Sequence, residues 1–324
     1  MKKLLATVGF VIALFGTGIA QAVNVPGPLV DAAWLQKHSK QVVTLDVRDD
    51  VKSFTGKPML IKDKKSGKLI VKSVGAHIPG ANLVNYKKIR VDRVVNGKKV
   101  EKIIPEKAAF EKMMQDVGVN KDSAVVIVSE GMNDLDLTMA TRLYWQLKYY
   151  GHDNMAILDG GMAQWLTDRR PISNQASQPA KGNWMASAER NELLATTDDV
   201  NNGLKSGVQL VDNRPLSQYM GVLKKSYVYD KGHIPGAKSY PTELVTDHST
   251  PAKLLPVQEL RELAKGMGID TGAETITYCN SGHLASGGWF IMHELMGNKK
   301  VKLYDGSMNE WTLNKGKTTE MKME

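Results

Sequence analysis

Short runs of consecutive aliphatic residues alternate along this chain with longer segments whose apolar residues recur every three or four positions. The runs are VVTLDV from Val42, AVVIVS from Ala124, VQLVD from Val208 and TITYC from Thr275. Consecutive apolar positions are typical of strands that are covered on both faces, since a strand with one wet face alternates. We therefore predict four buried strands at these positions.

Four segments have the helical periodicity, and each closes near a glycine. They are residues 107–119, 138–151, 257–269 and 284–297. A glycine just after the last periodic residue is a common helix end, because it adopts the left-handed backbone conformation at little cost. Alternating strands and helices of this kind predict an α/β fold, with a mostly parallel open sheet that carries helices on both faces.

The chain contains an internal repeat. Three stretches of the first half match three of the second in the same order: 42–50 with 208–216, 75–86 with 231–241, and 154–165 with 300–311. The offset between matched stretches shrinks along the chain, so one ancestral unit occurs twice, with longer insertions in the first copy. Residues 169–183, rich in Pro, Ser, Asn and Gln, form the expected linker. The predicted domains are 23–175 and 176–324.

The extra length of the first copy lies in two lysine-rich insertions, residues 57–73 and 89–104. Each has a turn signal at its centre, Ser66-Gly67 in the first and Asn96-Gly97 in the second, so both are predicted hairpins. Two interpretations remain open. The insertions are either solvated additions or a basic face on which a protein partner docks.

The first 22 residues have the layout of a signal peptide. Lys2 and Lys3 precede an apolar stretch from Leu4 to Ala20, and Ala20-Gln21-Ala22 supplies the small residues of a cleavage site. The alternative, an uncleaved anchor, needs a longer uninterrupted apolar stretch. We expect cleavage after Ala22, export to the periplasm, and no stable membrane insertion after cleavage.

The formal net charge is +9, and +7 without the two lysines of the predicted signal peptide. A positive excess attracts small anions or an anionic membrane surface. The lysines are scattered and the protein is expected outside the cytoplasm, so nucleic acid is not an expected partner.

The chain has one cysteine, Cys279, which cannot form an internal disulfide. A lone thiol in an exported protein is either buried and inert or reactive.

Cys279 ends a predicted strand, and the next helix is expected to begin at Leu284 or Ala285. Ligands of open α/β sheets bind at this junction. Gly282 permits a tight turn that would direct backbone N–H groups inward as an anion nest. Such surroundings favour a nucleophilic thiolate and an anionic persulfide.

The first copy has Ser129 where the second has Cys279, and its loop is four residues longer. No Gly-x-Ser-x-Gly elbow surrounds this serine, so a serine nucleophile has little support. Glu130, Asp134 and Asp136 follow it and would repel an anionic substrate. We interpret the first copy as a non-catalytic scaffold.

Together these motifs resemble the tandem-domain rhodanese sulfurtransferases of the thiosulfate or 3-mercaptopyruvate type. The motifs are Asp-x-Arg after the first long strand of each copy, His-Ile-Pro-Gly-Ala at 77–81 and 233–237, and an Asp-Gly turn followed by Trp near the end of each copy. A Cys-x-x-Gly loop occurs only in the second copy. The resemblance covers residues 30 to 315 and implies two rhodanese-like domains, the second catalytic.

By this resemblance, Cys279 takes a sulfane sulfur from a small-molecule donor and passes it to cyanide or a thiol. The resemblance assigns donor binding to the loop residues Asn280, Ser281, Gly282, His283, Leu284 and Ala285. It implies no metal and no organic cofactor. A carrier that holds a persulfide or an oxyanion with little turnover is the alternative. A cysteine phosphatase is disfavoured, because Ala285 stands where its Cys-x5-Arg arginine would be.

The loop departs from the thiosulfate-using members, which carry cations after the cysteine. Asn280 and Ser281 occupy these positions, which is closer to the mercaptopyruvate type. Gln218 replaces an arginine that helps to bind the donor in the family, and either Lys224 or Lys225 compensates or the donor is a different compound. His283 is open to three interpretations: an anion ligand, a proton-transfer group or a plain surface residue.

The remaining repeated residues have structural interpretations. Arg48 and Arg214 are expected to pair with the aspartate of their own Asp-x-Arg motif, although contact of Arg214 with substrate is an alternative. His77 and His233 occur in both copies, including the one without a cysteine, so a structural role is favoured over a catalytic one.

Overall fold

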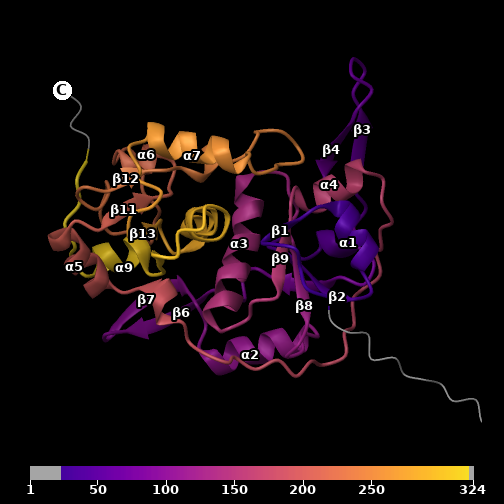
Figure 1. Cartoon of the computed structure of the whole chain (residues 1–324), viewed down its shortest axis with the longest axis horizontal. Helices are drawn as coiled ribbons and strands as arrows, with labels where there is room; N and C mark the ends of the chain where they lie inside the picture. Colours follow the sequence, from indigo (N-terminus) through magenta and orange to yellow (C-terminus); the bar gives the residue numbers. More distant parts are fainter. Residues whose placement is uncertain (1–22, 321–324) are drawn as a thin grey trace, which may run out of the picture.

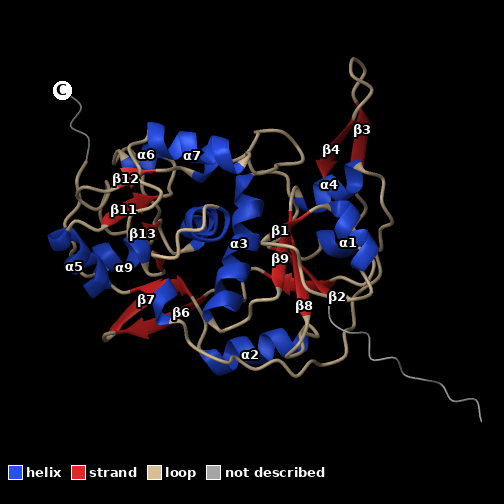
Figure 2. Ribbon diagram, viewed as in Figure 1, coloured by secondary structure: helices blue, strands red, loops and turns tan. Residues whose placement is uncertain are grey.

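Each half of the chain builds one five-stranded sheet in which all neighbouring strands are parallel (Figures 1 and 2). The computed structural model describes residues 23–320, so the predicted signal peptide at 1–22 lies outside the described part. The first sheet has the order β1-β9-β8-β2-β5, with β1 Leu29–Val30, β2 Val42–Arg48, β5 Asn82–Asn85, β8 Ala124–Val128 and β9 Met155–Leu158. The second has the order β10-β14-β13-β11-β12, with β10 Leu194–Ala195, β11 Gln209–Asp212, β12 Lys238–Ser239, β13 Thr275–Tyr278 and β14 Val301–Tyr304.

Helices cover both faces of each sheet, which confirms the predicted α/β fold (Figure 2). The helices of the first half are α1 Ala32–His38, α2 Lys107–Asp116, α3 Asp134–Tyr149 and α4 Gly161–Thr167. Those of the second are α5 Thr197–Ser206, α6 Leu216–Tyr219, α7 Val257–Gly266, α8 His283–Trp289 and α9 Ser307–Leu313, with a π-helical turn at Phe290–Leu295 that continues α8. Short 3-10 turns occur at Ser53–Thr55, Asn191–Leu193 and Thr242–Leu244.

The consecutive apolar residues of a strand divide between two hydrophobic clusters. In β8, Val125 and Ile127 belong to one cluster, while Val126 and Val128 belong to another on the opposite face. Side chains of a strand alternate between faces, so a strand buried on both sides must be apolar throughout. This packing is the physical reason for the uninterrupted runs in the sequence.

The two halves share one hydrophobic core. The largest cluster contains α3 residues such as Trp145 together with α8 residues such as Trp289, so it spans both sheets. Gly287 of α8 lies so close to α3 that an added Cβ would be 2.9 Å from Thr138 Cγ2. The two halves therefore meet mainly where α3 packs against α8, and Figure 1 shows α3 between the two sheets.

Both predicted hairpins are present. Strands β3 Met59–Lys62 and β4 Leu69–Ser73 form the first, which projects away from the body of the molecule (Figure 1). Strands β6 Val91–Val95 and β7 Lys98–Ile103 form the second, with positive φ at Asn96 and Gly97 in its turn. This second hairpin packs on α9 of the other half, so it is an interdomain contact rather than a freely solvated addition.

The repeated motifs make equivalent contacts in each half. Arg48 pairs with Asp46 at 2.5 Å and Arg214 with Asp212 at 2.6 Å, which confirms the two internal ion pairs. His77 Nδ1 donates to the Phe54 carbonyl and His233 Nδ1 to the Tyr219 carbonyl, each at 2.8 Å. The same histidine contact occurs in the half without a cysteine, which supports the structural interpretation of the histidines.

The segment that joins the halves first runs along the first half. The Gly182 N–H donates to the Gln115 carbonyl at 2.8 Å, and the Trp184 N–H donates to the Val119 carbonyl at 3.1 Å. Trp184 is buried beside Phe110 of α2. The division between residues 175 and 176 stays a prediction.

Among the described residues, no helix combines the length and the apolar character that a bilayer crossing requires.

Candidate active site

Cys279 lies at the carboxyl end of β13, where the sheet meets the beginning of α8. Only 1% of its surface is exposed. Its N–H donates to Ser307 Oγ at 3.0 Å, and its carbonyl accepts from the Met308 N–H at 3.0 Å. Contacts of its main-chain groups with the first two residues of α9 thus fix the position of this residue.

The turn after the cysteine depends on Gly282, which has φ +73° and caps α8. An added Cβ would lie 2.3 Å from Asp305 Oδ1 and 2.4 Å from Arg142 Nη1, so the position requires glycine for space as well as for conformation. The helix begins at His283, whereas the start was expected at Leu284 or Ala285.

Ser307 anchors this loop, and the sequence analysis had assigned it no role. Its Oγ accepts from the N–H groups of Cys279 at 3.0 Å and Gly282 at 3.1 Å, and donates to the Tyr304 carbonyl at 2.7 Å. Ser307 itself has φ +49°, an uncommon conformation for a residue with a side chain. Such strain persists where the surroundings hold it, and it often marks a functional site.

An arginine of the first half also supports the loop. Arg142 of α3 is fully buried, and its Nη1 lies 2.5 Å from Asp305 Oδ1 and 3.2 Å from the Gly282 carbonyl. Asp305 Oδ2 accepts from the Ile104 N–H at 2.7 Å. A buried ion pair requires such additional hydrogen bonds, because both charges have lost their water.

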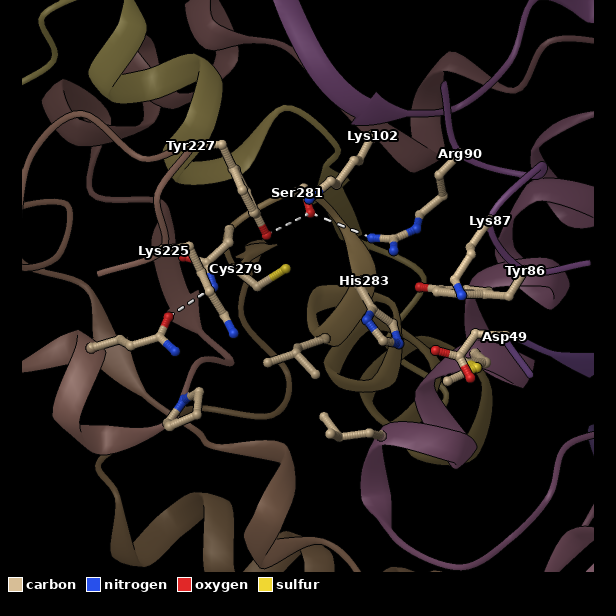
Figure 3. A pocket seen from close by; sticks show the side chains of 16 residues that line it. Asp49, Tyr86, Lys87, Arg90, Lys102, Lys225, Tyr227, Cys279, Ser281 and His283 are labelled. Carbon is tan, nitrogen blue, oxygen red and sulfur yellow. Dashed lines mark hydrogen bonds between the residues drawn. The ribbon is translucent and has the colours of Figure 1, made fainter. Parts of the chain in front are cut away.

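A cavity of about 410 Å³ opens over the cysteine, and both halves form its walls (Figure 3). Of the seven residues that the sequence analysis assigned to the site, five line it: Cys279, Asn280, Ser281, His283 and Leu284. Gly282 instead shapes the turn. Ala285 is fully buried in the shared hydrophobic core, and its carbonyl accepts from Thr277 Oγ1, so it faces away from the cavity.

Asn280 and Gln218 form one wall. Asn280 Nδ2 donates to Gln218 Oε1 at 2.8 Å, while Asn280 Oδ1 has no hydrogen-bond partner within the described part of the chain. Lys225 lines the cavity, whereas Lys224 donates to the Val228 carbonyl at 2.7 Å. Of the two lysines considered as substitutes for the missing arginine, Lys225 is therefore the one in position.

His283 is not a plain surface histidine. It lies in the cavity wall, where Nε2 is 3.0 Å from Thr138 Oγ1 of the first half. Burial, together with the charges of Arg90 and Arg142, lowers the pKa of His283 well below its usual range. The ring is therefore neutral at pH 7, which argues against a role as a cationic anion ligand.

The first half contributes residues that the sequence analysis missed: Asp49, Tyr86, Lys87, Arg90 and Lys102 (Figure 3). The Arg90 guanidinium lies 4.4 Å from the Tyr86 ring centre, and its Nη1 comes within 3.5 Å of Ser281 Oγ. The Lys102 ammonium lies 3.8 Å from the Tyr227 ring centre. Four cations therefore line the cavity, Lys87, Arg90, Lys102 and Lys225, against the single carboxylate of Asp49. This excess of positive charge favours anionic ligands.

The corresponding loop of the first half is acidic and filled. Ser129 is buried, and an added Cβ on Gly131 would lie 2.2 Å from the Gly160 carbonyl oxygen. Burial, together with the charges of Glu130 and Asp49, raises the pKa of Asp136 to about 6. These features support the interpretation of the first copy as a scaffold.

Within residues 23–320, no three His, Cys, Asp or Glu side chains lie close enough to hold a metal ion.

Comparison with known families matches the rhodanese-like domain at residues 30–168 and again at 196–314. A Haloferax volcanii protein named "Putative thiosulfate sulfurtransferase" is 31% identical over 73% of this chain and 80% of its own length. The sulfur carrier protein TtuD of Thermus thermophilus is 29% identical over 88% of this chain and 94% of its own length.

Solved structures share the fold. The Tum1 protein of Saccharomyces cerevisiae aligns with a TM-score of 0.73 and 21% identity, covering 92% of this chain and 99% of its own. The anaerobic ergothioneine biosynthesis enzyme of Chlorobium limicola aligns with a TM-score of 0.71 and 20% identity, covering 92% of this chain and 71% of its own. At these identities the likeness extends to the fold alone.

Proposed function

This chain belongs to the rhodanese-like family, and we propose that Cys279 carries out its sulfur-transfer reaction through a persulfide. The relatives named as thiosulfate sulfurtransferases and as a sulfur carrier support a sulfur-transfer function. One observation carries the assignment to Cys279. The only cysteine of the chain lies at the base of a cationic cavity, on the loop between a strand end and a helix start.

The first half-reaction loads the cysteine. The Cys279 thiolate attacks the terminal sulfur of thiosulfate, a new S–S bond forms, and sulfite leaves with the electron pair of the broken S–S bond. With 3-mercaptopyruvate, the C–S bond breaks instead. The departing enolate of pyruvate then takes the proton of the donor thiol, and the persulfide remains as an anion.

The second half-reaction discharges the enzyme. Cyanide or a thiolate attacks the outer sulfur of the persulfide, the S–S bond breaks, and the Cys279 thiolate is restored. The products are thiocyanate or a persulfide of the acceptor. Because the donor product leaves before the acceptor reacts, the mechanism is ping-pong.

The loop backbone supports the persulfide. The N–H groups of Cys279 and Gly282 are held by Ser307, whereas those of Asn280 and Ser281 have no acceptor within the described part of the chain. These two N–H groups are therefore available to the outer sulfur. Preorganised donors of this kind stabilise a charge without reorganisation during the reaction.

A carrier with little turnover is the second candidate function. It is favoured by the deep burial of Cys279 and by the similarity to TtuD, a named sulfur carrier, over nearly its full length. In this alternative the persulfide forms as described, and a docking protein rather than a small acceptor removes the sulfur. The exposed lysines of the β3–β4 hairpin, such as Lys64 and Lys65, offer a basic surface for such a partner.

We also propose that the protein acts in the periplasm after cleavage following Ala22, on the basis of the N-terminal pattern. The mass of the mature protein, purified from a bacterial host that exports it, tests this point. A chain that begins at Val23 is the expected result, and retention of residues 1–22 would contradict it.

Initial rates of thiocyanate formation separate the enzyme from the carrier. We expect parallel lines in double-reciprocal plots when thiosulfate or 3-mercaptopyruvate is varied at several cyanide concentrations, and no product with Cys279→Ser. A burst of one thiocyanate per chain followed by negligible turnover would favour the carrier. Sustained product formation by the serine variant would overturn the assignment of Cys279.

A further inference from the structure

We infer that Arg90 and Lys102, both from the half without a cysteine, form the subsite that binds the oxyanion group of the sulfur donor. The inference rests on the proposed function and adds to it the chemistry of the donor. The donor carries a sulfonate or a carboxylate close to its transferable sulfur. The oxyanion lies beside Ser281 while the sulfur faces Cys279.

The geometry brings both cations to one point of the cavity. Arg90 Nη1 lies 3.5 Å from Ser281 Oγ, and the Tyr227 hydroxyl lies 3.4 Å from the same oxygen. The Lys102 ammonium in turn lies over the ring of Tyr227. Figure 3 shows Arg90 and Lys102 approaching Ser281 from the same side, with the sulfur of Cys279 nearby. An anion at Ser281 would therefore meet two positive charges.

The backbone is distorted in a way that directs Lys102 into the cavity. Asp92 of β6 stands opposite two residues of β7, Glu101 and Lys102, which makes a β-bulge. Lys102 has φ +61°, and its N–H donates to Asp92 Oδ1 at 3.1 Å. Bulges commonly re-aim a side chain beside an active site, and a positive φ at a residue with a side chain costs free energy.

The hairpin that carries Lys102 is fixed to the catalytic half. The Glu101 N–H donates to Asn309 Oδ1 at 2.9 Å, and the Ile104 N–H donates to Asp305 Oδ2 at 2.7 Å. The Lys98 ammonium donates to the Leu313 carbonyl at 3.2 Å. The position of Lys102 relative to Cys279 is therefore set by these contacts between the halves.

The charges of these two residues are free for a ligand, unlike those of their neighbours. Arg93 pairs with Glu106, and Lys99 pairs with Asp92 at 2.9 Å. Within residues 23–320, Arg90 Nε is buried without a hydrogen-bond partner, and neither Arg90 nor Lys102 has a carboxylate within ion-pair distance. A charge at an interior wall favours an anionic partner, because its own hydration is incomplete.

The same arrangement accounts for the missing cations of the catalytic loop. Asn280 and Ser281 leave the loop without charge, and Gln218 replaces the arginine expected from the family resemblance. Lys225 supplies one cation from the catalytic half, and Figure 3 shows it on the side of Cys279 away from Arg90. Both cations beside Ser281 come from the insertion at residues 89–104, with Arg90 just before β6 and Lys102 within β7.

The test measures persulfide loading of Arg90→Gln and Lys102→Gln in single-turnover reactions at increasing donor concentration. Thiosulfate and 3-mercaptopyruvate are used in separate arms, which distinguishes a sulfonate from a carboxylate. Discharge of the loaded proteins by dithiothreitol, an acceptor that has neither a sulfonate nor a carboxylate, is measured in parallel. Lys99→Gln is the matched control, since Lys99 lies on the same strand, is 67% exposed in its side chain and does not line the cavity. Arg90→Lys tests rescue by charge.

We expect the donor concentration for half-maximal loading to rise ~10- to 100-fold in Arg90→Gln and ~10-fold in Lys102→Gln, with discharge by dithiothreitol unchanged. Arg90→Lys should recover part of the loss, and Lys99→Gln should behave as wild type. Unchanged loading by both Gln variants would overturn the inference, as would an equal slowing of loading and discharge. Wild-type protein that fails to load with either donor would overturn the proposed function itself, a result distinct from these.

Discussion

The loops that follow β8 and β13 have the same backbone frame and opposite surroundings. The Met162 N–H donates to the Ser129 carbonyl at 2.8 Å, just as the Met308 N–H donates to the Cys279 carbonyl at 3.0 Å. Around Ser129 the loop is longer, acidic and packed against its own glycine turn. Around Cys279 it borders a cationic cavity. The fold thus supplies the frame, and a few side chains decide whether it can carry chemistry.

The first half, although it has no cysteine, contributes residues to the site. Helix α3, which follows the Ser129 loop, presents Arg142 and Thr138 to the loop of the other half. The loop just before β6 presents Arg90 to the cavity, and β7 presents Lys102. The comparison suggests a division of labour, in which one copy holds the proposed nucleophile and the other supports its loop and supplies three of the four cations of the cavity. The following predictions test that division.

The largest effect is expected from Arg142→Met. The substitution leaves Asp305 buried without its counter-charge, and removing one partner of a buried ion pair costs about 3–5 kcal/mol of unfolding free energy. Urea denaturation provides the measurement, and the double variant Arg142→Met/Asp305→Asn should recover part of the loss. A cost below 1 kcal/mol would contradict the view that the first half holds the catalytic loop.

Gly282→Ala is expected to be nearly as severe. The alanine must adopt φ +73° and its Cβ would overlap Asp305 and Arg142, so we expect a loss of about 2–4 kcal/mol. Gly236→Ala is the matched control, because Gly236 has φ +78° in the same half with nothing within 4 Å of an added Cβ. The control should lose about 1 kcal/mol from backbone strain alone. Equal losses in the two variants would show that the space around Gly282 is unimportant.

Asp136→Asn tests the acidic character of the first loop. Since the pKa of Asp136 is raised to about 6, the folded chain binds its proton more tightly than the unfolded chain between pH 4 and pH 6. Stability of the wild type therefore falls as pH rises through this window. The asparagine variant should be more stable by about 1–3 kcal/mol at pH 7 and equal to wild type near pH 3. Thermal unfolding from pH 3 to pH 7 measures the difference, and a destabilised variant at pH 7 would contradict the prediction.

Ser307→Gly converts the turn beneath the catalytic loop into that of the first copy, where Gly161 has φ +55°. The glycine relieves the strained backbone but leaves two buried N–H groups without their acceptor, so we expect a net loss of about 1–3 kcal/mol of unfolding free energy. The loop loses the hydroxyl that accepts from Cys279 and Gly282, so we expect persulfide loading to slow by ~10-fold. The reverse change, Gly161→Ser, would place a Cβ 2.4 Å from the Ser129 carbonyl oxygen, so it should destabilise the first half instead. Normal loading by Ser307→Gly would mean that the hydroxyl serves only the fold.

Much of the fold could be predicted from the sequence, because local sequence signals determine its strands and its second hairpin. The uninterrupted apolar runs identified the buried strands, and Asn96-Gly97 identified the second hairpin. Both internal ion pairs follow from the Asp-x-Arg spacing. The π-helical turn at Phe290–Leu295 has no such signal, since its apolar positions read as ordinary helix.

The candidate site could be predicted only in its own half. The strand–loop–helix signal located Cys279 and the residues after it, although Ala285 proved to face the core. Arg90 and Lys102 lie about 180 residues or more before the cysteine, and only the packing of the two halves brings them to it. Ser307 did have a signal, because it is a serine where the repeat has a glycine.

The most direct test of the account is the intact mass of the reduced protein before and after incubation with thiosulfate, and separately with 3-mercaptopyruvate. The account predicts a gain of one sulfur atom (~32 Da) that cyanide removes and that Cys279→Ser does not show. A wild-type mass that stays unchanged with both donors, while the thiol remains titratable, would contradict the central claim that this cysteine carries the transferred sulfur.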